Sequence, residues 1–185
     1  MTASNPKVIA VCQGELSVSG DPNVVLSCIL GSCIAACLWD PTARVGGMNH
    51  ILLPGRRNDA SGHNKFGVFA MEALINELMH IGGRKTNLVA KIFGGANTFE
   101  NGLGIGEANA AFVRDFLEAE SIPIKAESIG GRQARRVRFF PESGHAKQLL
   151  TAEAVPIEET KPPKTPPRDR RPAVPPGGSG EVELF

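Results

Sequence analysis

The sequence has almost no net charge, no long apolar run and no sign of a signal peptide. Its 20 Lys and Arg residues stand against 19 Asp and Glu residues, which leaves a formal charge of +1. Such a balance creates no field that would attract a phosphate backbone or an anionic lipid surface, so it argues against nucleic acid as a partner. No apolar stretch approaches the length of a membrane span, and residues 1–7 lack basic and apolar leader regions. We expect a cytoplasmic protein without membrane insertion.

Cysteine is also scarce, and its four occurrences all lie in the first 37 residues. A disulfide framework is not expected in a reducing cytosol, which leaves thiol chemistry, metal binding or packing as roles for Cys12, Cys28, Cys33 and Cys37. The last three, together with His50, would in principle supply four tetrahedral zinc ligands. Structural zinc sites favour C-x-x-C pairs, whereas here four and then three residues separate these cysteines. We therefore expect no metal.

A change in composition divides the chain near residue 152. The chain as a whole is 42% hydrophobic and contains nine Phe residues, enough for one packed domain, which we assign to residues 1–152. Eight of the fourteen prolines fall within residues 156–176, and a Gly-Gly-Ser-Gly run follows them. Residues 153–185 are therefore predicted to be a disordered tail. Its final Glu-Val-Glu-Leu-Phe is either a tethered docking peptide or an unselected remnant.

Apolar periodicity predicts two helices, at residues 65–80 and 106–119. The apolar positions of the first helix include Phe66 and Phe69, and two glycines follow it as a stop signal. Shorter apolar runs between glycine, proline and aspartate predict strands at residues 8–11, 16–19, 24–30, 34–39, 45–53, 88–93, 122–129 and 135–140. Strands and helices do not alternate regularly, so the pattern favours an α+β fold of layered sheets over a doubly wound parallel sheet.

Cys33 lies at a break between two predicted strands, directly after Gly31 and Ser32. A glycine there lets the backbone turn tightly and expose amide N–H groups, as a nucleophile with an oxyanion hole requires. A hairpin through Asp40-Pro41 would bring His50 to the same place, where a neutral imidazole within hydrogen-bond reach would lower the pKa of the thiol. The alternatives are that Cys33 is a buried small apolar residue and that His50 is a half-buried histidine with its hydrogen bonds satisfied.

Three motifs occur in a fixed order, at residues 30–35 (LGSCIA), 46–50 (GGMNH) and 91–96 (KIFGGA). Together they resemble the CheD family of chemoreceptor glutamine deamidases. The resemblance extends over residues 7–150, so it covers the whole predicted domain and leaves out the tail. It implies a protein-glutamine glutaminase of bacterial chemotaxis, with a layered α/β/β sandwich similar to the catalytic domain of the cytotoxic necrotizing factor toxins.

The resemblance also implies the chemistry. The Cys33 thiolate would attack the side-chain carboxamide of a receptor glutamine, and His50 would protonate the leaving ammonia and then activate water, with no metal or organic cofactor. Backbone N–H groups around Gly31 and Ser32 would hold the oxyanion. In the family a Thr commonly precedes the cysteine by six positions and orients the histidine. Here that position is Ser27, which retains a hydroxyl for the hydrogen bond.

The expected substrates are methyl-accepting chemotaxis receptors. Gly94 and Gly95 would permit close approach of a receptor helix, and Asn49 is a further candidate for substrate binding. Arg132 and two arginines after it would meet acidic receptor residues, or would lie on a solvated strand end. The resemblance implies a second function as well, that of an adaptor that binds a CheC-type phosphatase and regulates chemotaxis signalling. We expect a monomer.

Overall fold

The computed structural model describes residues 5–53, 63–97 and 104–151, which belong to a compact unit spanning Met1–Val155. The predicted disordered tail lies outside the described residues. The strands are β1 (Lys7–Ala10), β2 (Leu16–Ser19), β3 (Val24–Leu30), β4 (Ile34–Asp40), β5 (Val45–Ile51), β6 (Val89–Gly94), β7 (Ile124–Ile129), β8 (Ala134–Phe140) and β9 (His145–Thr151). The helices are α1 (His63–His80) and α2 (Ile105–Ala119), with a short 3-10 helix, η1 (Lys85–Asn87).

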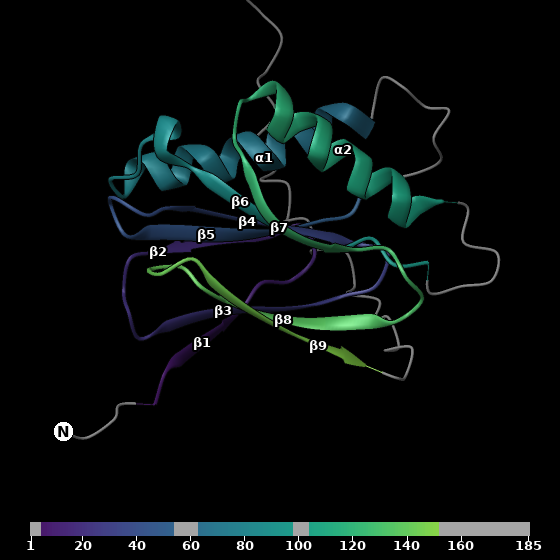
Figure 1. Cartoon of the computed structure of the whole chain (residues 1–185), viewed down its shortest axis with the longest axis horizontal. Helices are drawn as coiled ribbons and strands as arrows, with labels where there is room; N and C mark the ends of the chain where they lie inside the picture. Colours follow the sequence, from purple (N-terminus) through teal and green to yellow (C-terminus); the bar gives the residue numbers. More distant parts are fainter. Residues whose placement is uncertain (1–4, 54–62, 98–103, 152–185) are drawn as a thin grey trace, which may run out of the picture. The chain divides into compact units, whose positions relative to one another are not determined.

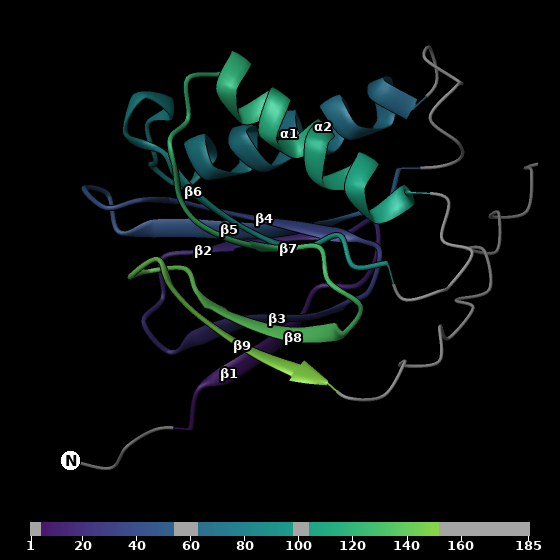
Figure 2. The same cartoon turned by 45° about the vertical axis from the view of Figure 1, so that its right-hand side comes forward.

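These elements form three layers (Figure 1). The five-stranded sheet has the order β2-β5-β4-β6-β7, and the four-stranded sheet has the order β1-β3-β8-β9. Both sheets are mixed, because β1 pairs with β3 and β6 pairs with β7 in parallel, whereas the other neighbours are antiparallel. Figures 1 and 2 show α1 and α2 on one face of the five-stranded sheet and the four-stranded sheet against its other face. The predicted α+β class is confirmed, and the layers follow the order α/β/β.

Alternation along β4 divides its side chains between two cores. Ile34 and Leu38 face the helices and join the core between the helices and the five-stranded sheet. Ala35 and Cys37 face the opposite way and join the core between the two sheets, which also contains Cys28 of β3. Because β4 is covered on both faces, its sequence is a continuous apolar run and not an alternating one. Cys28 and Cys37 therefore serve packing, as their position in apolar runs indicated.

Two local features differ from the predictions. No strand was expected at β9, whose sequence HAKQLLT is mostly exposed because it pairs only with β8 at the edge of its sheet. Along α1, the residues that face the sheet include Met71, Leu74 and Leu78, which are fully buried. Phe66 and Phe69 share their apolar spacing but are 42% and 69% exposed. Helical periodicity therefore identified the helix correctly and overstated how much of it is covered.

One end of the sandwich gathers the segments that carry the three sequence motifs. β4 runs antiparallel to both β5 and β6, and Ile34 at its start lies opposite Ile51 of β5 and Gly94 of β6. Residues 31–33, which join β3 to β4, are therefore next to the last residues of β5 and β6. Both helices also begin at this end, on the right of Figure 2.

Candidate active site

The register of the β4–β5 hairpin places Cys33 and His50 diagonally across two neighbouring strands. Ala35 of β4 lies directly opposite His50 of β5, and Cys33 precedes Ala35 by two positions. Residues two apart point to the same face of a strand, and diagonal neighbours have Cα atoms about 7–8 Å apart, within reach of their side chains. Cys33 and Ala35 both pack against the core between the two sheets. The register therefore directs Cys33 and His50 to one side of the five-stranded sheet.

Hydrogen bonding fixes the tautomer of His50, whose side chain is buried. Its Nδ1 lies 3.1 Å from the carbonyl oxygen of Val11. Because a carbonyl oxygen can only accept, Nδ1 carries the proton and Nε2 has the free lone pair. Nε2 is also buried, and within the described part of the chain it has no hydrogen-bond partner. Nε2 is thus the ring nitrogen whose lone pair is free to accept a proton.

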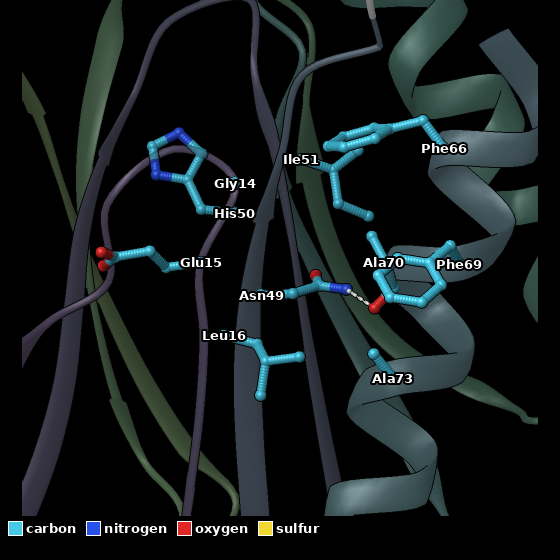
Figure 3. A pocket seen from close by; sticks show the side chains of 10 residues that line it. All are labelled: Gly14, Glu15, Leu16, Asn49, His50, Ile51, Phe66, Phe69, Ala70 and Ala73. Carbon is cyan, nitrogen blue, oxygen red and sulfur yellow. Dashed lines mark hydrogen bonds between the residues drawn. The ribbon is translucent and has the colours of Figure 1, made fainter. Parts of the chain in front are cut away.

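The surroundings of His50 favour the neutral imidazole. Burial lowers the pKa of His50, while the hydrogen bond to Val11 and the carboxylate of Glu15 oppose this effect. The His50 N–H donates to the carbonyl of Glu15 at 3.0 Å, and the N–H of Gly14 donates to the carbonyl of His50 at 2.8 Å. In Figure 3 the side chain of His50 points away from α1. The histidine is therefore held in place by its backbone and its ring together.

The thiol of Cys33 is half-buried and neutral. Burial raises its pKa to about 11, and the backbone amide of Cys33 opposes that effect. The thiol donates a hydrogen bond to Oε1 of Gln13 at 3.8 Å. The pKa of the thiol is therefore raised and not lowered as predicted, because burial disfavours the charged form of both the thiol and the imidazole. A neutral thiol and a neutral imidazole form the resting site.

Three consecutive carbonyl groups anchor the segment before β4. Each accepts a hydrogen bond from a different part of the chain, so the segment is fixed from three directions. The bonds run from Ala96 N–H to Gly31 O at 2.8 Å, from Asn109 Nδ2 to Ser32 O at 2.8 Å, and from Gly95 N–H to Cys33 O at 2.7 Å. None of these bonds uses the amide N–H groups of the segment.

Asn109 is a residue of the site that sequence reasoning missed. It is fully buried on α2, where its Oδ1 accepts from the N–H of Leu53 at 3.1 Å while its Nδ2 donates to Ser32. A polar side chain at this depth is stable only when both ends of its amide are paired. The available signal was its position one residue before Ala110 and four before Val113, both on the buried face of α2.

Gly94 and Gly95 permit a close approach between two parts of this chain, and not the approach of a substrate helix. Both are buried, and both have positive φ, +117° and +65°. A Cβ on Gly94 would collide with the carbonyl oxygen of Cys33, and one on Gly95 would lie 2.7 Å from the carbonyl oxygen of Gly106. Gly94 therefore lets the end of β6 approach Cys33, and Gly95 lets the start of α2 approach the chain just after β6. The predicted contact with a substrate helix is therefore wrong for both.

Ser27 and Asn49 also have structural partners in place of the predicted ones. The Ser27 hydroxyl donates to the carbonyl of Val137 at 3.1 Å. Its neighbours Leu26 and Cys28 point into the core between the sheets, so alternation directs Ser27 to the opposite face, away from His50. The backbone carbonyl of Val11 therefore takes the orienting role predicted for the Ser27 hydroxyl.

Asn49 faces the helices, where its Nδ2 donates to the carbonyl of Ala70 at 3.2 Å, as the dashed line in Figure 3 shows. Its Oδ1 accepts from the N–H of Ala36 at 3.1 Å. The side chain is 2% exposed. Asn49 thus ties β4 and β5 to α1, which contradicts its predicted role in substrate binding.

The three arginines after the Gly130-Gly131 turn do not form one exposed group. Arg135 is 3% exposed, and its guanidinium donates to the carbonyls of Ser128 and Gly130. It therefore braces the connection between β7 and β8 and cannot meet a partner protein. Arg132 and Arg136 are exposed.

A pocket of about 70 Å³ lies beside His50, between β5 and α1 (Figure 3). Its lining is mainly apolar and includes Leu16, Ile51, Phe66 and Phe69. The two phenylalanines are the exposed side chains noted above on α1. Exposed aromatic side chains next to a concave apolar surface are typical of a contact site for another molecule.

Within residues 5–53, 63–97 and 104–151, no three or more His, Cys, Asp or Glu side chains are grouped so as to hold a metal ion. In the same ranges, neither helix is long and apolar enough to cross a membrane.

A thiol and a histidine with a free lone pair on one face of a sheet, beside a segment anchored through its carbonyl groups, define a candidate site for acyl transfer. The profile of the CheD family, described as CheD chemotactic sensory transduction, matches residues 52–149. A protein of Caulobacter sp. (strain K31), named probable chemoreceptor glutamine deamidase CheD, is 48% identical over 98% of this chain and 95% of its own length.

Two further relatives have the same name. The protein of Caulobacter vibrioides (strain NA1000 / CB15N) is 48% identical over 96% of this chain and 92% of its own length. The protein of Rhizobium meliloti (strain 1021) is 46% identical over 96% of this chain and 95% of its own length. The chain belongs to the CheD family.

Among solved structures, a Neisseria meningitidis protein of family DUF152 is similar with a TM-score of 0.43 and 13% sequence identity. The likeness covers 69% of this chain and 63% of that protein. It is too weak to support a conclusion about function.

Proposed function

We propose that this chain deamidates glutamine side chains of methyl-accepting chemotaxis receptors to glutamate, as a protein-glutamine glutaminase that releases ammonia. Relatives that are 46–48% identical are named for this activity. The observation that carries the proposal is the lone pair of His50 Nε2, which has no partner in the described part of the chain and lies on the sheet face that Cys33 shares. A thiol that attacks an amide needs such a base beside it.

The reaction starts from a neutral pair. As the sulfur of Cys33 attacks the carboxamide carbon, Nε2 of His50 takes the thiol proton, so that no free thiolate has to accumulate in a buried site. The imidazolium then protonates the departing amine, which leaves as ammonia. His50 next takes a proton from water, and the resulting hydroxide attacks the thioester. The C–S bond breaks to give glutamate, and the Cys33 thiolate takes the proton back from the imidazolium, which restores the neutral pair. The Val11 carbonyl accepts from Nδ1 throughout and stabilises the positive charge on the ring.

The oxyanion of each tetrahedral intermediate needs preorganised N–H donors. The amide groups around Gly31, Ser32 and Cys33 are suited to this task, because the three carbonyls of the segment are already anchored. The anchoring bonds keep these amides from reorienting when the charge develops. This supports the predicted role of Gly31 and Ser32 as backbone donors.

The apolar pocket beside His50 supports a contact with the receptor surface. Phe66 and Phe69 offer aromatic area that is exposed before any partner binds. Burial of such area contributes about 25 cal/mol per Å². Cys33 is not part of the lining of this pocket, so the contact would be with receptor surface at some distance from the target glutamine.

Several finer predictions accompany this function. The catalytic domain ends near residue 152, and residues 153–185 form a Pro/Gly-rich disordered tail. The protein works in the cytoplasm as a monomer, its fold is related to the catalytic domain of the cytotoxic necrotizing factor toxins, and a CheC-type phosphatase is a second partner. These predictions come from the sequence and its resemblance to the family.

The direct test mixes the full chain with the cytoplasmic fragment of a chemoreceptor and maps conversion of glutamine to glutamate by mass spectrometry. We expect Cys33→Ala to lower the rate by roughly 10³-fold or more. Cys12→Ala is the matched control, because Cys12 is exposed and outside the proposed mechanism. Full activity of the Cys33→Ala protein would refute the proposal.

A further inference from the structure

The side chain that meets the sulfur of Cys33 belongs to a glutamine. Oε1 of Gln13 accepts a hydrogen bond from the Cys33 thiol at 3.8 Å. The carboxamide of Gln13 is the same chemical group that the proposed reaction attacks. A residue of the protein therefore lies where the reactive group of the substrate has to arrive.

The backbone beneath Gln13 is fixed on both sides. The N–H of Val11 donates to the carbonyl of Ser27 at 2.8 Å, and the N–H of Gly14 donates to the carbonyl of His50 at 2.8 Å. Between them, the N–H of Glu15 donates to the carbonyl of Cys12 at 2.9 Å and closes a tight turn. Gly14, with φ +82°, adopts the left-handed conformation that the turn needs.

The side chain of Gln13 is free to move, in contrast to its backbone. Gln13 is exposed, and its single described side-chain hydrogen bond is the one to the sulfur. A thiol is a weak donor, so this contact is weak compared with the bonds that hold the turn. Rotation about the side-chain bonds is therefore enough to open the site.

We propose that Gln13 is a placeholder for the substrate: its carboxamide occupies the subsite of the receptor glutamine and is displaced when that glutamine binds. This inference rests on the proposed deamidase function. Gln13 is a positioning residue and does not itself react, because its carboxamide meets the sulfur with the oxygen and not with the carbon. Productive attack needs the opposite arrangement, with the carbon at the sulfur and the oxygen at N–H donors.

The placeholder has two effects on the site. It covers the sulfur through the S–H hydrogen bond, and it competes with the substrate for the same space. Its removal should expose the sulfur and raise the fraction of protein that is ready to bind. The net contribution of one hydrogen bond changes the equilibrium constant between the covered and the open site by a factor of roughly two to ten.

The test uses Gln13→Ala in the full chain, with Cys12→Ser in all proteins so that the exposed Cys12 does not react. Alkylation of Cys33 by iodoacetamide at one fixed pH should be roughly two- to tenfold faster in the variant. KM for a chemoreceptor cytoplasmic fragment should fall by a similar factor while kcat is retained. Gln148→Ala, at an exposed glutamine on β9, is the matched control and should change neither value.

The possible outcomes separate this inference from the proposed function. Unchanged alkylation together with unchanged KM would overturn the placeholder even in an active deamidase. Faster alkylation with an unchanged KM would also overturn it, because Gln13 would then only shield the thiol. Absence of deamidation by the parent protein would instead refute the proposed function, and the alkylation rates would still test the contact between Gln13 and Cys33.

Discussion

Asn109 is the residue whose removal tests most directly how the cysteine segment is held. Asn109→Ala removes the side-chain partner of two backbone groups, the half-buried carbonyl of Ser32 and the buried N–H of Leu53. Each orphaned group costs about 1–3 kcal/mol, so we expect the free energy of unfolding to fall by about 2–6 kcal/mol. That is a large part of the roughly 5–15 kcal/mol that stabilises a typical domain.

The same substitution should also slow the reaction. With Ser32 no longer anchored, the N–H groups that hold the oxyanion lose their fixed position, and a displacement of about 1 Å costs about 10²-fold in rate. We expect kcat to fall much more than KM rises, measured where the variant is still folded. Urea unfolding followed by circular dichroism gives the stability, and the receptor deamidation assay gives the rate.

Glu118→Ala is the control for the Asn109 experiment, because Glu118 lies on the same helix and is exposed. It should change the free energy of unfolding by no more than about 0.5 kcal/mol. A stable Asn109→Ala protein, or a destabilised one with an unchanged kcat, would show that the bond to Ser32 does not support the site.

Two further predictions concern the histidine and the apolar pocket. Glu15→Gln removes the carboxylate that raises the pKa of His50, so that pKa should fall further below its ordinary value. Because the neutral imidazole is the active base, the acid limb of the kcat/KM profile should move to lower pH, and a shift to higher pH would contradict the assigned role. Phe69→Ser should raise KM for the receptor fragment about tenfold, which is the loss of affinity expected when part of a buried aromatic contact is removed. The value of kcat and the thermal unfolding temperature should change little, because Phe69 is 69% exposed. An unchanged KM would separate the pocket from substrate binding.

The local elements were readable from the sequence because local rules determine them. The run at residues 34–39 is apolar at every position, as a strand covered on both faces must be, and the structure has β4 there. The hairpin through Asp40 also followed from local signals, and its register places Ala35, two positions after Cys33, opposite His50. β9 was missed because an edge strand with solvent on most of its side chains has no apolar pattern to detect.

The partners of individual side chains were not readable, because they depend on contacts between distant parts of the chain. Ser27 and Val137 are 110 positions apart, and Asn109 and Ser32 are 77 positions apart. The predicted roles of Gly94 and Arg135 failed for the same reason. A glycine in a sequence indicates a close approach, and an arginine indicates a charged contact. Only the fold shows that here the partner in both cases is another part of the same chain.

The high pKa of the Cys33 thiol has a consequence for the lifetime of the protein. At neutral pH a thiol with a pKa of about 11 is ionised in roughly one molecule in ten thousand. Peroxides and electrophilic metabolites react with the thiolate and hardly at all with the thiol. We therefore expect the proposed nucleophile to resist oxidation until a substrate amide lies in front of it.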